Sequence, residues 1–193
     1  LRLRPCFGMG KLFPENIKCD TKGGMEKAYQ QILGQLQRAQ LIAVSKFQLK
    51  EKIESLFKLG QRDFGENRVQ ELLQKANSLK HLEGIKWHFI GKLQTNKINQ
   101  ILKIPSLYAI HSVDNHKILS SLCAKTQDRS TPLWFFIQVN TSGEKEKGGV
   151  ESLHEIMELL DFFKEEKPKN LKFLGLMTMG PIRTDHFEKD AKD

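Results

Sequence analysis

Cysteine is scarce in this sequence, and the few that occur share no metal-binding or redox spacing. Cys6, Cys19 and Cys123 are odd in number and form no CxxC pair, so neither a disulfide framework nor a zinc site is indicated. The six histidines form no HxxxH or HExxH pair, so a metal site has no support. Free thiols fit a reducing compartment, and we expect a cytoplasmic protein.

Long apolar runs are also missing. No segment approaches the roughly 20 apolar residues of a membrane-crossing helix, and no secretory signal is visible. The net charge of +8 would suit nucleic acid or anionic metabolites, but lysine and arginine are scattered over the predicted helices. We therefore expect neither a membrane nor a nucleic acid as a partner.

Periodicity is absent from the first 24 residues. This stretch is basic, poor in acidic residues, and ends in Gly23-Gly24 before Met25. It lacks the serine richness of a transit peptide. We interpret residues 1–24 as a non-native or disordered leader and residues 25–193 as the folded domain.

From Met25 onward, apolar runs alternate with amphipathic helical patterns six times, which predicts a parallel α/β sheet. The predicted strands span residues 41–46, 62–65, 86–91, 107–113, 133–140 and 171–179. No glycine-rich turn follows the first strand, which disfavours an open nucleotide-binding sheet. We therefore predict a (β/α)8 TIM barrel with six of its eight βα units in this chain, leaving the first and sixth strands with unpaired edges.

The first predicted strand delivers a primary amine to its carboxyl end. Leu41 to Lys46 reads as a buried strand, and alternation places Lys46 on the same side as Ile42 and Val44. In a barrel this end carries the chemistry, and a neutral lysine amine there can attack an aldehyde to form a Schiff base. The alternative is a lysine that begins a surface loop.

Three further residues are candidates for the same site. Asn67 follows the second strand and would either approach the same ligand or cap the next helix. His88 lies in an apolar strand; we count it as a ligand-binding candidate, with a satisfied core histidine as the alternative. Lys147 lies in a glycine-bearing loop whose order is not that of a P-loop, and it is the residue there most able to reach an anion; a solvated loop is the alternative.

Six motifs together resemble the pyridoxal phosphate homeostasis protein family, which is similar in fold to the amino-terminal barrel of alanine racemases. The motifs are Ala43-Val44-Ser45-Lys46, Gly60 to Asn67 with Val69-Gln70-Glu71, Trp87 to Gln94 with Asn96-Lys97, Ile110 to Asp114, Gln138 to Glu144, and Gly175-Leu176-Met177-Thr178.

The resemblance implies a barrel that holds pyridoxal 5′-phosphate as a Schiff base on Lys46. Asn67 matches the family's asparagine beside the cofactor and Lys147 its loop lysine. The resemblance also implies a non-catalytic carrier in vitamin B6 homeostasis. Apo-enzymes would be the recipients of the cofactor, and the full-length protein would be a monomer. A racemase-like enzyme is the alternative, but alanine racemases draw a second acid/base from an additional domain, and none is visible here.

Two departures from the family pattern affect the expected affinity. Gln48 stands where many members have a second lysine. The family's Ser-Met-Gly-Met-Ser and Arg-Ile-Gly segments, which cradle the phosphate, have no counterpart before Asp193. We therefore expect this chain to hold the cofactor weakly. We also expect it to self-associate, because the unpaired edges of its first and sixth strands can pair with another copy.

Overall fold

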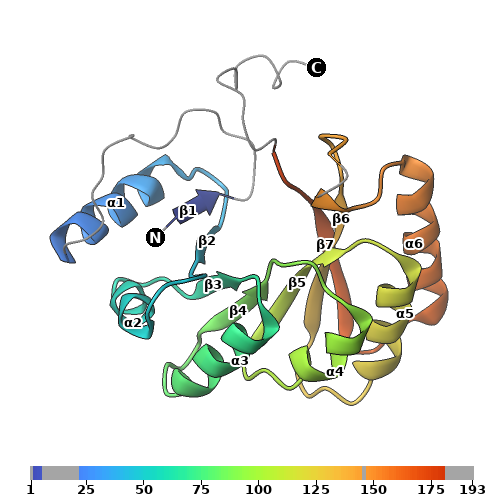
Figure 1. Ribbon diagram of the computed structural model, residues 1–193, viewed down its shortest axis with the longest axis horizontal. Coiled ribbons are helices and arrows are strands. Elements are labelled where there is room, and N and C mark those ends of the chain that lie inside the picture. The colour runs from blue at the N-terminus through green and yellow to red at the C-terminus, as the bar shows by residue number, and fades with distance from the viewer. Residues whose placement is uncertain (1, 6–21, 145–146, 181–193) are drawn as a thin grey trace.

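The structure is a computed structural model that describes residues 2–5, 22–144 and 147–180, and one sheet forms its centre (Figure 1). Six parallel strands make up most of the sheet: β2 (Leu41–Val44), β3 (Asp63–Glu66), β4 (Lys86–Phe89), β5 (Leu107–Val113), β6 (Leu133–Val139) and β7 (Leu171–Thr178). Helices occupy the connections: α1 (Lys22–Gln35), α2 (Lys50–Lys58), α3 (Val69–Ser78), the short η1 (Thr95–Lys97) and α4 (Ile98–Ile101), α5 (His116–Lys125) and α6 (Leu153–Glu166).

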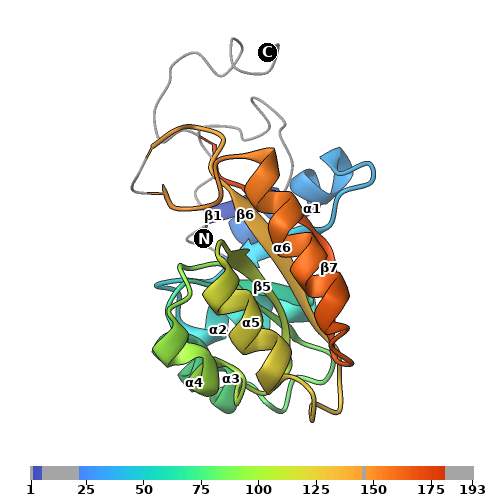
Figure 2. The same ribbon diagram turned by 90° about the vertical axis from the view of Figure 1, so that its right-hand side faces the viewer.

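The parallel strands pair in the order in which they occur along the chain, from β2 to β7. A doubly wound sheet would reverse direction at a switch point, whereas a barrel adds each strand next to the previous one. The sheet curves, with helices α2 to α6 on its outer side (Figures 1 and 2). The prediction of a six-stranded parallel α/β sheet, arranged as part of a barrel, is confirmed.

Alternation along each strand separates a helix-facing side from an inner side. Phe64, Trp87 and Phe135 are fully buried, and the Phe135 ring packs against Phe163 of α6 at 5.1 Å between centroids. On the inner side, a Cβ placed on Gly65 would lie 3.2 Å from Ile90 and 3.3 Å from Ile42. The inner face of β2 and β3 therefore carries residues 42, 44, 63 and 65.

The predicted leader departs from expectation at residues 2–5. These residues form β1 (Arg2–Pro5), which pairs antiparallel with β2, and α1 begins at Lys22 rather than after Met25. The prediction of a disordered leader is wrong for this short segment, and so is the prediction of an unpaired edge on the first parallel strand. Residues 6–21 lie outside the described part of the chain.

Helix ends follow local chemistry. Gly60 follows the C-terminus of α2 with φ of 104°, a left-handed conformation that favours glycine. Asn115 caps α5, because its side chain accepts a hydrogen bond from Ile118 N at 3.0 Å. Among the helices of the described residues, none combines the length and apolar character that crossing a membrane requires.

Candidate functional site

The carboxyl end of β2 turns sharply, and Lys46 sits at the corner. β2 ends at Val44, and one further hydrogen bond to β3 follows, from Ser45 N to Gly65 O at 2.9 Å. Gln48 N then donates to Ser45 O at 3.0 Å, closing a four-residue turn around Lys46 and Phe47. Phe47 has φ of 61°, a left-handed conformation that is unfavourable for a bulky residue. The predicted strand 41–46 is therefore shorter, because the turn replaces its last two residues.

Lys46 is half-buried and unengaged. Within the described ranges, no hydrogen bond or ion pair reaches its Nζ. Most charged side chains this close to a sheet either pair or extend into solvent. A partly buried amine without a partner is therefore free to react with, or bind, an incoming group.

Asn67 directly follows β3, the strand that pairs with β2. Val44 pairs with Gly65, and Lys46 and Asn67 each follow that pair by two residues, so both lie at the carboxyl end of the sheet. Asn67 Oδ1 is buried and has no hydrogen-bond partner among the described residues. The alternative role as a helix cap is not used, since the N-cap of α3 is Arg68. A buried amide oxygen without a partner is costly, so its presence at the same end of the sheet as a free amine indicates a ligand site.

His88 is buried between two side chains of the inner face. Its Nε2 lies 3.0 Å from Asp63 Oδ1, and its Nδ1 lies 2.9 Å from His111 Nε2. An ionised carboxylate can only accept, so His88 Nε2 donates to Asp63. With both nitrogens engaged, His88 can reach a ligand only through ring carbons. The structure thus favours a core role, and the ligand-binding role of His88 stays a prediction.

Burial and neighbouring groups shift the pKa values of His111 and Asp63. Burial, followed by the neighbouring His88, lowers the pKa of His111 from 6.5 to about 3, so His111 is neutral near pH 7. For Asp63, burial opposes ionisation, yet hydrogen bonds from His88 and Gln40 and the charges of His88 and Lys86 bring its pKa below the ordinary 3.8. The His111 ring stacks on Phe136 at 4.3 Å between centroids.

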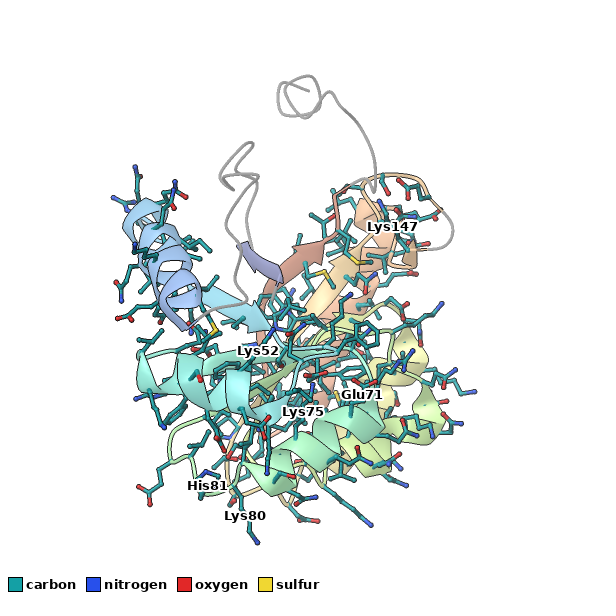
Figure 3. All side chains as sticks on the ribbon, turned by 60° about the vertical axis from the view of Figure 1, so that its left-hand side comes forward. Lys52, Glu71, Lys75, Lys80, His81 and Lys147 are labelled. Carbon is teal, nitrogen blue, oxygen red and sulfur yellow. The ribbon has the colours of Figure 1, made fainter. Side chains whose placement is uncertain are left out.

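Lys147 is engaged elsewhere. Its side chain is 6% exposed, and its Nζ lies 3.0 Å from Glu144 Oε1, 2.9 Å from Gly180 O and 3.3 Å from Ser142 Oγ. These contacts use its three donors and tie the loop after β6 to the end of β7. In Figure 3, Lys147 lies well away from Lys52. Lys52 belongs to α2, the helix that follows Lys46. The described contacts do not bring Lys147 together with Lys46 and Asn67.

A hollow of about 540 Å³ lies beside the N-termini of α5 and α6. Asp114, Glu151, Glu155 and Glu158 line it, and neither Lys46 nor Asn67 does. Four carboxylates would repel a phosphate, so this hollow is unsuited to an anionic ligand.

Several residues of this region escaped the sequence analysis. Ser45, Glu66 and Lys75 form a polar cluster behind the turn, and Asp63 and His111 flank His88. One signal was available: alternation places Glu66 on the helix-facing side of β3, where a charged residue needs a partner.

Comparison with known proteins assigns the family. Residues 24–191 match the model of the alanine racemase N-terminal domain. The chain belongs to this family. It is 41% identical over 161 residues to the pyridoxal phosphate homeostasis protein of Caenorhabditis elegans, covering 81% of this chain and 65% of that one. The same-named human protein is 39% identical over 150 residues, covering 75% of this chain and 54% of that one. The resemblance identified from the motifs is confirmed.

Solved structures show the same fold. PipY of Synechococcus elongatus PCC7942, solved with PLP bound, has a TM-score of 0.76 and 28% identity, covering 86% of this chain and 76% of that chain. The alanine racemase of E. faecalis has a TM-score of 0.59 at 17% identity and shows the fold alone. The chain thus spans roughly half to two thirds of the curated relatives and about three quarters of PipY.

Proposed function

We propose that this chain binds pyridoxal 5′-phosphate, holds it as a Schiff base on Lys46, and acts in intracellular vitamin B6 homeostasis. The observation that carries the proposal is that an unengaged Lys46 amine and the buried, unpaired amide oxygen of Asn67 follow the ends of two adjacent strands. The naming of the relatives and the PLP-bound PipY structure support it.

The chemistry of the two side chains fits this cofactor. Pyridoxal 5′-phosphate supplies an aldehyde that condenses with a primary amine, next to a phenolic oxygen. Lys46 provides the amine. The Asn67 amide can present either its oxygen or its nitrogen after a half-turn of the side chain, and Nδ2 would donate to the phenolic oxygen.

A carrier fits better than a racemase. Racemisation needs a proton donor and an acceptor on opposite faces of the cofactor. His88 lies on β4 and pairs with Gly65, two residues before Asn67. Both of its ring nitrogens are engaged, one by Asp63 and the other by His111. We therefore propose a non-catalytic role, with apo-enzymes that use this cofactor as recipients.

Substitution of the amine tests the proposal. Wild type incubated with the cofactor is expected to show a visible imine band, and borohydride should leave a pyridoxyl adduct on the peptide containing Lys46. Lys46→Ala should abolish both. Lys50→Ala, which removes an exposed lysine four residues away, should retain both.

A pyridoxyl adduct on another lysine would contradict the assignment of Lys46. Exchange of amino-acid α-protons, followed by NMR in deuterated water, separates a carrier from a racemase. We expect no exchange above that of free cofactor; enzyme-level exchange that depends on Lys46 would favour the racemase.

A further inference from the structure

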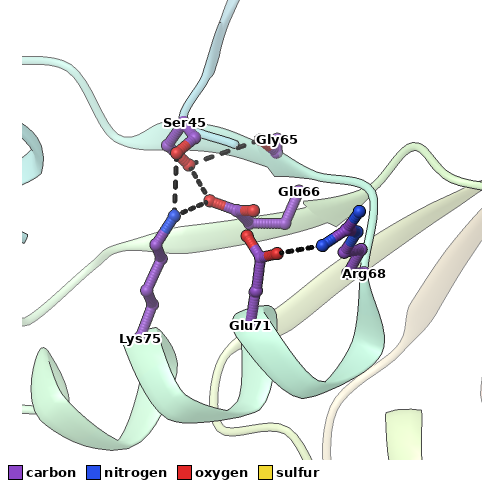
Figure 4. A network of polar contacts seen from close by, with 6 residues as sticks. All are labelled: Ser45, Gly65, Glu66, Arg68, Glu71 and Lys75. Atoms are coloured by element: carbon purple, nitrogen blue, oxygen red, sulfur yellow. Dashed lines mark hydrogen bonds and ion pairs between the residues drawn. The ribbon is translucent and has the colours of Figure 1, made fainter. Parts of the chain in front are cut away.

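A polar cluster lies behind the Lys46 turn, between the sheet and α3 (Figure 4). Glu66 Oε1 accepts hydrogen bonds from Ser45 Oγ at 2.7 Å and from Lys75 Nζ at 2.6 Å. Lys75 Nζ also donates to the backbone oxygen of Ser45 at 2.8 Å. Three elements, the end of β2, the end of β3 and the last turn of α3, thus meet at one ammonium group.

Each member of the cluster on the sheet is next in sequence to a residue of the candidate site. Ser45 precedes Lys46, and Glu66 precedes Asn67. Ser45 and Glu66 both contact Lys75 of α3, and each is joined by one peptide bond to Lys46 or to Asn67. The link between Ser45 and Glu66 therefore constrains the spacing of the backbone at Lys46 and Asn67.

Lys75 also supports the turn itself. The Ser45 carbonyl belongs to the peptide bond that carries Lys46, and it accepts from both Lys75 Nζ and Gln48 N. The turn holds Phe47 in a left-handed conformation that a bulky residue adopts with difficulty. This backbone strain favours opening of the turn. Lys75 opposes the opening by donating a hydrogen bond to the Ser45 carbonyl from outside the turn.

The burial of the ion pair makes the support dependent on both partners. The Glu66 side chain is fully buried, and that of Lys75 is 15% exposed. Glu66 Oε2 has no hydrogen-bond partner among the described residues, so the carboxylate is held through Oε1 alone. Removing the ammonium would leave a buried, uncompensated charge behind the turn.

We propose that Glu66 and Lys75 are positioning residues for Lys46, fixing the turn that presents its amine at the same end of the sheet as Asn67. The inference rests on the proposed function, because it concerns cofactor capture by Lys46. It assigns no contact with the cofactor to either residue. It makes cofactor capture depend on Glu66 and Lys75 in addition to Lys46 and Asn67.

Three variants separate positioning from folding. Lys75→Met leaves Glu66 charged and buried, so it should lose both stability and cofactor binding. The double variant Glu66→Gln/Lys75→Met removes both charges, so it should recover much of the stability. Its turn still lacks the donor to Ser45 O, and we expect imine formation to stay slower and affinity weaker by about tenfold or more.

Arg129→Met is the matched control. Arg129 is a half-buried cation that donates to Leu102 O at 3.3 Å and Leu107 O at 3.2 Å, at the opposite end of the sheet. Its loss should lower stability and leave the imine band and its rate of formation at the wild-type level. All measurements are made where thermal unfolding shows each variant to be fully folded.

The outcomes are distinct for the two proposals. If wild type forms no band and no adduct at Lys46, the proposed function fails. If wild type does so and the folded double variant matches it in rate, affinity and band position, the positioning role is overturned and the cluster is structural only. A folded double variant that is slow and weak, beside an unaffected Arg129→Met, supports the inference.

Discussion

Gly91 is packed against the backbone of Asn67. A Cβ on Gly91 would overlap the carbonyl oxygen of Asn67 and lie 2.7 Å from its carbonyl carbon and 2.9 Å from its Cα. Backbone cannot move aside as a flexible side chain can, so the end of β4 accepts only glycine here without displacing Asn67.

Gly91→Ala is therefore expected to shift Asn67 and weaken cofactor binding. We expect a loss of stability of about 1 to 3 kcal/mol, as for overpacked sites, and a lower yield of the trapped adduct on Lys46. Chemical unfolding and borohydride trapping measure the two effects. Gly34→Ala is the control, because a Cβ there meets nothing within 4 Å in α1, and it should stabilise by about 0.5 to 1 kcal/mol. Unchanged binding in Gly91→Ala would contradict the close approach.

Glu71→Gln is expected to stabilise the protein. The Glu71 carboxylate points toward that of Glu66, whose Oε2 lacks a partner (Figure 4). A glutamine amide would donate to this oxygen, for a gain of about 0.5 to 1.5 kcal/mol, against the loss of the Arg68 pair at 3.2 Å. That pair is worth only a few tenths of a kcal/mol, roughly, since Arg68 is exposed. In urea unfolding, Glu54→Gln should be near neutral; destabilisation by Glu71→Gln would contradict this account.

Acidification is expected to destabilise the protein through His111. An unfolded histidine binds a proton near pH 6.5, whereas burial and His88 delay protonation of the folded His111 to about pH 3. The unfolded state thus binds more protons between these values, and the free energy of unfolding falls by up to roughly 1.4 kcal/mol per pH unit. Asp63, whose pKa is also lowered, acts in the same direction below its ordinary 3.8.

The measurement is the slope of unfolding free energy against pH. His111→Gln should reduce the slope between pH 6.5 and about 3, the interval over which the wild-type histidine resists protonation. His154→Gln is the control, since His154 is 82% exposed, and it should leave the slope unchanged. An identical slope in wild type and His111→Gln would show that His111 does not carry the effect.

Deletion of residues 1–21 separates the roles of β1 and the candidate site. Lys46 and Asn67 lie outside this segment, so we expect the imine band to persist. The edge of β2 would lose its antiparallel partner, and backbone amides of Leu41–Val44 should exchange hydrogen faster. Exchange at the full-chain rate would indicate that β1 contributes nothing to β2.

The sequence predicts those features that depend on local periodicity. Alternation along 41–46 and the loop after the second strand placed Lys46 and Asn67 at one end of the sheet, and the register agrees. Strand length was less predictable, because the Ser45 to Gln48 turn depends on a donor from Lys75, thirty residues away. Nothing local in the chain identifies such a partner.

Contacts between residues far apart in the sequence could not be predicted either. His88 and Lys147 carry functional groups that suit a cofactor site. In the structure, His88 contacts Asp63 and His111, and Lys147 contacts Glu144 and Gly180. Residue type and spacing indicate what a side chain can do. Which neighbour satisfies it is settled only when distant strands pack together.

The stepwise pairing of β2 to β7 also bears on how the protein forms. Each parallel strand pairs with the next one along the chain, so bringing Lys46, Asn67 and Gly91 to one end of the sheet closes loops of roughly twenty residues each. Short loops cost little entropy to close, and this half of the sheet needs no strand beyond β4 to bring those residues together. During synthesis, which proceeds from the N-terminus, the corner that holds Lys46, Asn67 and Gly91 would therefore be complete while β6 and β7 are still untranslated.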